Sequence, residues 1–309
     1  MRNSFAEKLL EIASGDEKVI LLAGDIGFRI FDKFIEKYPD RFINCGIAEQ
    51  NMISIAAGMA SEGMRPVVYT IIPFLVMRAF EQIRVDIGIN AEPVILVGVG
   101  GGLAYDKLGS THHAYEDVSL MRTIPNMKLF TPYDPKDTAK CLMESYREAK
   151  NNGLPSYIRL SKGGEENLPI QKEITTNIHF LKSNKPTCNL FITHGSIASI
   201  VLKSLQSEEY HHVSLISISE LSQPSLIEMV NFLKKHQDYL NQVTIVEETF
   251  APGGLHEALT SLLSKLCIPI YLKHIKIDHK YIFDIDIREN LLQKYGINST
   301  KIKEIASKN

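Results

Sequence analysis

The sequence predicts an α/β protein of two domains, each with a mainly parallel sheet flanked by helices. Short apolar runs rich in β-branched residues alternate with helix-period segments along the whole chain, which is typical of parallel strands joined by crossover helices. A length of 309 residues suits two domains of ordinary size. A polar, glycine-containing stretch near the middle of the chain marks the boundary between them.

We expect the first domain at residues 1–164. Residues 19–24 are a continuous apolar run, as expected for a strand buried on both faces. A helix has a clear start signal at Asp134 and Pro135, because Asp can cap the first turn and Pro suits the first helical position. Strands are expected at 19–24, 66–72, 93–99, 126–131 and 156–160, and helices at 3–14, 50–62, 76–89, 115–123 and 135–151.

The second half of the chain repeats this alternation. Residues 165–185 are polar and weakly periodic, which predicts a linker. We expect the second domain at residues 186–309, with strands at 188–193, 213–218, 242–247 and 270–275, and helices at 196–206, 224–235 and 254–266.

Composition argues against several kinds of partner. The formal net charge of −2 gives no basis for binding nucleic acid or an anionic membrane, and no apolar run approaches the roughly 18 residues of a membrane helix. Four cysteines are widely spaced without a C-x-x-C pair, which favours reduced thiols in a cytoplasmic protein. We predict no metal site, since the adjacent His112 and His113 have no third ligand nearby.

Residues able to do chemistry occur where strands of the first domain end. Asp25 follows the first strand, at the sheet edge where α/β proteins bind ligands. Glu49 opens a helix of small residues, although the helix dipole alone explains a Glu in a first turn. A glycine-rich loop, 98–109, leads into Ser110-Thr-His-His113, but such a loop by itself is not a dinucleotide fingerprint.

A longer match gives these residues a context. The string Asp40-Arg-Phe-Ile-Asn-Cys-Gly-Ile-Ala-Glu-Gln-Asn51, followed by Ile55-Ala-Ala-Gly-Met-Ala60, resembles the start of the pyrimidine-binding domain of the transketolase family of thiamine diphosphate enzymes. Residues 243–256 and 295–304 resemble that family's C-terminal domain. The resemblance therefore implies a thiamine diphosphate-binding pyrimidine domain fold followed by a transketolase C-terminal domain-like fold.

The resemblance also implies roles for individual residues. In the family, the glutamate that matches Glu49 touches the aminopyrimidine ring of the cofactor and activates its carbanion chemistry. The histidine that matches His112 reaches the substrate-derived group, and an arginine at the position of Arg159 holds the acceptor's phosphate, which suits its bidentate fork. The implied catalytic residues are Glu49 and His112, the cofactor-binding set is Glu49, Asp25, Ile72, Phe74, Leu75 and Arg78, and the substrate-binding set is Arg29, Asp106, His112, His113 and Arg159.

One family signature is missing from the chain. There is no Gly-Asp-Gly with a downstream Asn, the motif with which such enzymes hold the diphosphate and its metal. We therefore expect a C-terminal subunit of a split transketolase-like enzyme. A separate N-terminal subunit would carry that motif and bind Mg²⁺, which demands octahedral oxygen ligands, and homodimerisation would give a heterotetramer. The expected reaction transfers a two-carbon ketol unit from a ketose or ketose phosphate to an aldehyde.

Three alternatives stay open. Gly100 and Leu108 stand where transketolases proper have a histidine and an acidic residue that read sugar hydroxyls, and Asp106 is a substitute for part of that task. Arg78 and residues 34–42 look like the 1-deoxyxylulose-5-phosphate synthase branch, which decarboxylates pyruvate. The remaining alternatives are the beta subunit of a 2-oxo-acid dehydrogenase and a non-catalytic scaffold. The sequence does not identify the donor, the acceptor or the pathway.

Overall fold

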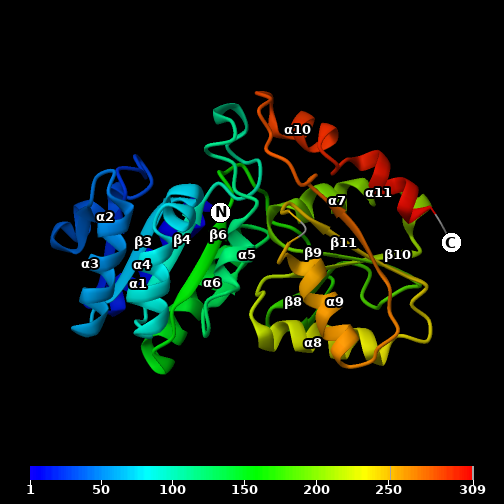
Figure 1. Ribbon diagram of the computed structural model, residues 1–309, viewed down its shortest axis with the longest axis horizontal. Helices are drawn as coiled ribbons and strands as arrows, with labels where there is room; N and C mark the ends of the chain where they lie inside the picture. Colours follow the sequence, from blue (N-terminus) through cyan, green and yellow to red (C-terminus); the bar gives the residue numbers. More distant parts are fainter. Residues whose placement is uncertain (251, 308–309) are drawn as a thin grey trace.

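A computed structural model describes residues 1–250 and 252–307, which form two sheet-centred domains side by side (Figure 1). Each sheet has six strands and is flanked by helices. The predicted fold class, two α/β domains with mainly parallel sheets, is confirmed. Among the described residues we find no helix whose length and apolar character would let it span a bilayer.

The first sheet is entirely parallel, with the order β2-β1-β3-β4-β6-β5. The connection from β1 runs to one neighbour, β2, and the chain then returns to the other side of β1 to form β3. This reversal leaves a crevice beyond the carboxyl ends of β1 and β3, where open α/β sheets usually bind ligands. The strands are β1 (Val19–Ala23), β2 (Phe42–Asn44), β3 (Arg65–Ile71), β4 (Ile95–Val99), β5 (Lys128–Phe130) and β6 (Ser156–Leu160).

Helices cover both faces of this sheet. On one face, α1 (Arg2–Gly15) and α6 (Pro135–Arg147) bury Phe5, Leu9 and Cys141 against β3 and β4. On the other face, α3 (Glu49–Ser61) packs Met52 and Ile53 onto the strands. The predicted start of α6 is present, since the Asp134 carboxylate accepts a hydrogen bond from the Asp137 N–H at 2.7 Å. The shorter helices are α2 (Asp32–Lys37), α4 (Phe80–Gln82) and α5 (Asp117–Met121).

The helix predicted at 76–89 differs from the observed backbone. Two π-helical stretches, Pro73–Met77 and Ile83–Ile89, flank the single α-helical turn α4. An apolar pattern of helical period does not distinguish bonds to the fourth residue from bonds to the fifth, so the prediction could not resolve these wider turns.

The second sheet is parallel except at one edge, with the order β12-β11-β9-β10-β8-β7. Strands β9 to β12 are parallel, whereas β8 pairs antiparallel with β10 and with β7. The strands are β7 (Lys172–Thr175), β8 (Ile178–Lys182), β9 (Asn189–Thr193), β10 (Val213–Ile218), β11 (Gln242–Glu247) and β12 (Leu272–Lys276), and the helices are α7 (Ala198–Ser204), α8 (Gln223–Lys235), α9 (Leu255–Lys265), α10 (Arg288–Lys294) and α11 (Ser299–Ala306).

The predicted linker at 165–185 is wrong for residues 172–182, which form the β7–β8 hairpin of the second sheet. In β8, Ile178 and Phe180 are buried, whereas Lys172 and Glu173 of the edge strand β7 are exposed. Charged residues are common on an edge strand, and here they obscured the alternation in the sequence. Residues 161–171 are the observed connection between the two sheets.

Backbone hydrogen bonds join the two domains. The Thr131 N–H donates to the Ser219 carbonyl at 2.7 Å, and the Leu221 N–H donates to the Leu129 carbonyl at 2.8 Å. Phe130 and Glu220 form an antiparallel bridge at the same place. The end of β5 thus pairs with the segment after β10, so that the first sheet is hydrogen-bonded to the second domain.

Candidate active site

Several of the residues singled out in the first domain lie near the carboxyl ends of β1, β3 and β4. Asp25 follows β1, Phe74 follows β3, and the glycine-rich loop that carries His112 follows β4. The fold therefore brings Glu49, Phe74, Arg78 and His112 into one row of contacts, described below from the carboxylate outward.

Glu49 is the first residue of α3, and its side chain is only 2% exposed. Its carboxylate accepts a hydrogen bond from Arg78 Nη1 at 2.7 Å. The Arg78 side chain is 42% exposed, so this ion pair joins a buried anion to a solvent-accessible cation. The positive end of the α3 dipole also stabilises the Glu49 carboxylate. A ligand that bonds the buried Glu49 carboxylate can replace Arg78, because the displaced arginine can turn into water.

The π-helical turn after β3 determines where Phe74 and Arg78 point. The Arg78 N–H donates to the Pro73 carbonyl at 3.2 Å, a bond to the fifth preceding residue. In this wider turn the Arg78 guanidinium carbon lies 4.4 Å from the centre of the Phe74 ring. The His112 ring also contacts Phe74, with its centroid 5.2 Å from that of Phe74 and the planes at 75°. π-helical turns are frequent at functional sites.

Ile72 and Leu75, predicted as cofactor contacts, have no exposed surface. Both side chains belong to the main hydrophobic core of the chain. Any added carbon at Gly98 would lie 2.6 Å from an Ile72 side-chain atom, which shows how closely β4 packs on this residue. Phe74 is half-buried and is the aromatic side chain of this turn.

The two adjacent histidines face different surroundings. His112 is half-buried, its Nδ1 lies 3.0 Å from the Thr111 hydroxyl, and its ring neighbours are Phe74 and Tyr105. His113 is buried, with Nδ1 3.3 Å from the Tyr115 hydroxyl. Burial lowers the pKa of both imidazoles, which favours the neutral form near pH 7. His112 is thus placed to meet a ligand, whereas His113 supports the loop from beneath.

The loop that carries these histidines is closed by a two-bond bridge between Gly102 and Ala114, at 2.7 and 2.9 Å. Gly102 has φ +63°, and a side-chain carbon there would lie 2.2 Å from the Glu248 carboxyl carbon. Only glycine satisfies both the backbone conformation and the close approach of the second domain.

Asp106, a predicted substrate contact, lies in this loop. Its carboxylate accepts from the Lys107 N–H at 2.7 Å and lies 3.7 Å from Lys162 Nζ. It is therefore oriented toward the start of the interdomain connection, and no contact links it to His112.

Asp25 and Arg29 lie on the exposed turn after β1. Both have left-handed backbone conformations, with φ of 51° and 65°, which are uncommon for residues other than glycine. The Asn44 side chain holds this turn, donating to the Asp25 carboxylate at 3.1 Å and accepting from the Asp25 N–H at 3.2 Å. Asn44 also accepts from the Gly46 N–H at 2.9 Å, so it ties the ends of β1 and β2 to the turn that precedes Glu49.

Arg159, the predicted phosphate ligand, is not part of this group. Its side chain is 5% exposed, and Nε donates to the Asp117 carboxylate at 2.9 Å. Nη2 donates to the carbonyls of Ala114 and Glu248 at 2.9 and 3.2 Å. A phosphate would have to displace a buried carboxylate, which costs several kcal/mol. The geometry therefore assigns Arg159 to the contact between the domains and gives no support to its predicted role.

The interdomain network contains residues that the sequence reasoning missed. Asp117 is fully buried, and it also accepts from the Tyr157 hydroxyl at 2.7 Å. Glu248 accepts from the Leu103 N–H at 2.8 Å and forms an ion pair with Arg288. The sequence signal was present as the acidic pair Glu247-Glu248 at the end of a strand, but its partners lie far away in the chain.

The arrangement at the sheet edge supports a defined set of chemical tasks. A buried carboxylate can form a strong hydrogen bond with a basic ring nitrogen, an aromatic face can support a flat ring, and a neutral imidazole can move a proton. Within the described residues we find no cluster of three or more His, Cys, Asp or Glu side chains arranged for a metal ion.

Comparison with known proteins places this geometry in context. The family described as transketolase, pyrimidine binding domain, matches residues 1–165. One subunit of the apulose-4-phosphate transketolase of Phocaeicola vulgatus is 29% identical over 279 residues, covering 87% of this chain and 85% of that protein. A solved split-gene transketolase, described as an inactive beta4 tetramer, superposes with a TM-score of 0.82 at 26% identity, covering 99% of this chain and 97% of that one.

A second group of relatives is longer. The 1-deoxy-D-xylulose-5-phosphate synthase of Clostridium perfringens is 30% identical over 319 residues, covering 97% of this chain but 48% of that protein. The chain therefore spans about half the length of these relatives, whereas it matches most of the length of the Phocaeicola vulgatus protein.

Proposed function

Because this chain belongs to the transketolase family, as the match over residues 1–165 shows, we propose that it is the C-terminal subunit of a two-chain thiamine diphosphate enzyme. The observation that carries the proposal is the buried Glu49 carboxylate, paired at 2.7 Å with an arginine that can leave it. A separate N-terminal chain would hold the diphosphate through Mg²⁺. Overlap with most of the length of a relative that is itself named as one subunit of a transketolase supports this division.

The residues at the sheet edge fit the aminopyrimidine end of the cofactor. Glu49 would hold a ring nitrogen, Phe74 would lie against the ring, and Arg78 would move aside toward solvent. When bound, thiamine diphosphate supplies a nucleophilic carbon that adds to a substrate carbonyl. Asp25 and Asn44 would brace the turn that precedes Glu49, since they already tie together the ends of β1 and β2.

We propose ketol transfer as the reaction, from a ketose or ketose phosphate to an aldehyde. His112 would donate a proton to, or accept one from, a substrate oxygen, because its imidazole is half-buried and its pKa is lowered. Arg29 is the better candidate for a phosphate contact than Arg159, because Arg29 is exposed and Arg159 is committed to Asp117. The Phocaeicola vulgatus relative is named as a transketolase of apulose 4-phosphate, which supports a phosphorylated substrate.

A second candidate reaction is carboligation from pyruvate. It is favoured by the match of nearly the whole chain to half of 1-deoxy-D-xylulose-5-phosphate synthase. The exposed guanidinium of Arg78 beside the site is compatible with a 2-oxo-acid carboxylate. Ketol transfer ranks first because the apulose-4-phosphate transketolase relative resembles this chain in length as well as in sequence.

A donor screen with the purified pair of chains tests the proposal. The chain is combined with an N-terminal subunit that carries Gly-Asp-Gly and a downstream Asn, with thiamine diphosphate and Mg²⁺. Ketose phosphates with an aldehyde acceptor should give product, and pyruvate with the same aldehyde should not. Activity with pyruvate and the aldehyde, but with no ketose phosphate, would select the second candidate. Failure of every donor would favour a non-catalytic scaffold.

The chain on its own should show no turnover and only weak binding of the cofactor. We expect calorimetry to show tight Mg²⁺-dependent binding only after the partner is added, in a cytoplasmic heterotetramer with two copies of each chain. The description of the solved neighbour as an inactive beta4 tetramer supports the expectation that this type of chain lacks activity without its partner. Tight binding of thiamine diphosphate and Mg²⁺ by this chain alone would contradict it.

A further inference from the structure

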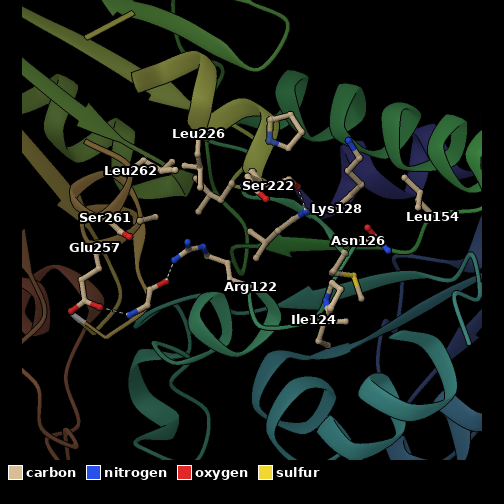
Figure 2. Close-up of a pocket in the computed structure, with 18 of the residues that line it drawn as sticks. Arg122, Ile124, Asn126, Lys128, Leu154, Ser222, Leu226, Glu257, Ser261 and Leu262 are labelled. Carbon is tan, nitrogen blue, oxygen red and sulfur yellow. Dashed lines mark hydrogen bonds between the residues drawn. The ribbon is translucent and has the colours of Figure 1, made fainter. Parts of the chain in front are cut away.

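A second recess lies between the two domains, away from Glu49. It has a volume of about 780 Å³, within the usual size range of small-molecule sites. One wall comes from residues 122–129 and Leu154, and the other from residues 221–226 and from α9, as Figure 2 shows. Lys128 begins β5 and Leu154 precedes β6. The cleft is therefore at the amino-terminal edge of the parallel first sheet, opposite the edge that carries the candidate active site.

Arg122 is the central cation of this cleft (Figure 2). Its Nη1 donates to the carbonyls of Gly253 and Gly254, and no described carboxylate lies within ion-pair distance of it. Glu247 and Glu257 attract it from beyond that distance, and Glu257 also lines the cleft. Both carboxylates already accept hydrogen bonds from backbone N–H groups of residues 253–256. Burial lowers the pKa of Arg122 and outweighs the attraction of these two carboxylates.

The contrast with Arg159 makes the missing partner informative. Arg159 is also buried, and a carboxylate neutralises it at 2.9 Å. Partly buried cations are normally paired with an anion. Arg122 has carbonyl acceptors on one side of its guanidinium and the open cleft on the other. An anion from solution can meet this need.

The remaining walls define what else the ligand would carry. Ile124, Leu154 and Leu262 contribute apolar surface, and Lys265 adds a second cation at the end of α9. Lys128 contributes less charge, since it lies 3.5 and 3.6 Å from the carboxylates of Glu220 and Glu148. We propose that this cleft binds a small organic anion, with a phosphate or carboxylate group on Arg122 and an apolar body against Ile124, Leu154 and Leu262.

Calorimetric titration of the full-length chain with three probes tests this proposal. Phenyl phosphate carries both features, whereas inorganic phosphate has only the charge and phenol only the apolar ring. Phenyl phosphate should bind at one site at least about tenfold more tightly than either fragment, because linking the two groups makes the second contact intramolecular. Arg122→Gln should weaken its binding by about tenfold, and the exposed control Arg84→Gln should stay within about twofold.

A second variant tests the cleft independently, in case Arg122→Gln misfolds. Ser261 is an exposed residue of α9 on the cleft wall, so Ser261→Phe fills the cleft and leaves every charge in place. It should abolish phenyl phosphate binding without lowering the unfolding temperature. Glu49→Gln should bind the probe like the wild type, which separates this site from the proposed active site. Absence of saturable binding, or equal binding by wild type, Arg122→Gln and Ser261→Phe, would overturn the proposal.

Discussion

The open edge of the first sheet and the buried network of Arg159, Asp117 and Glu248, which forms a seam between the domains, each contain an arginine paired with a carboxylate. At the edge, Arg78 holds Glu49 at 2.7 Å with 42% of its side chain exposed. At the seam, Arg159 holds Asp117 at 2.9 Å with side chains 5% and 0% exposed. Both pairs join a guanidinium nitrogen to a carboxylate oxygen, and they differ in how much water reaches the cation.

That difference separates a contact available for function from one that maintains the fold. Arg78 can enter water, so it can leave Glu49 at little cost once a ligand bonds the buried carboxylate in its place. A buried cation cannot leave without stranding a charge, which costs about 3–5 kcal/mol. The edge is therefore suited to exchange Arg78 for a ligand, and the seam is suited to hold two domains in a constant relation.

The largest effect should come from the carboxylate at the edge. Glu49→Gln should slow hydrogen–deuterium exchange at the cofactor's reactive carbon by about a thousandfold in the assembled enzyme, because an amide cannot supply the carboxylate's proton or charge. The exchange rate can be followed by proton NMR. The unfolding midpoint should change little, since Arg78 is free to enter water.

The exposed Glu81→Gln is the matched control, because it makes the same chemical change on a neighbouring surface. Its exchange rate should equal that of the wild type. An exchange rate for Glu49→Gln within a few-fold of wild type would remove Glu49 from the proposed mechanism.

At the seam, the expected loss is in stability. Asp117→Asn should lower the free energy of unfolding by about 3–5 kcal/mol in urea, because Arg159 would keep its charge in a buried place. Glu11→Gln, which removes an exposed pair with Lys8, should cost less than about 1 kcal/mol. If both variants lost the same small amount, the distinction between the seam and the surface would be refuted.

The adjacent histidines allow the same comparison across a single peptide bond. His112→Asn should reduce turnover by about a hundredfold with little change in stability, because this ring faces Phe74 at the site. His113→Asn should mainly lower the melting temperature, since its ring contacts the buried Tyr115. The pKa of His112 is lowered by burial, so any loss of activity that it causes at acid pH should lie below about pH 6.5. Interchanged effects would show that the assignment is reversed.

The smallest effect concerns pH and the second domain. Burial, and then the charge of Lys140, lowers the pKa of His179 to about 4. Its neutral form therefore supports the fold above about pH 6.5, and that support is lost as the pH falls toward 4, because the unfolded chain binds the proton first. Compared with His179→Gln, the wild type should lose up to about 1 kcal/mol of stability per pH unit across this window.

The His179 comparison must be made as a difference between the two proteins. Burial raises the pKa of Asp137 to about 7, so this group makes the native state bind a proton and opposes the His179 slope. Urea titrations of both proteins at several pH values cancel the Asp137 contribution. Identical pH profiles would show that His179 titrates normally.

Local patterns in the sequence determined most of the strands and helices, and the resemblance to the transketolase family named Glu49, His112 and Phe74 as candidates. Asp134 and Pro135 specify the start of α6 within one turn, and strand β1 is apolar throughout. These features depend on neighbours in the chain, so the sequence can reveal them. The β7–β8 hairpin was missed because the exposed charges Lys172 and Glu173 of the edge strand made this segment resemble a polar linker.

Only the tertiary structure decided which arginine is exposed at the sheet edge and which is buried where the domains meet. Arg78 and Arg159 look alike in sequence, and burial of one follows from Asp117 and Glu248, residues 42 and 89 positions away. The π-helical turn that aims Phe74 and Arg78 depends on backbone bonding that side-chain periodicity does not encode. Whether an arginine can exchange its carboxylate partner for a ligand depends on its exposure to water. That exposure is set by how distant segments of the chain pack together.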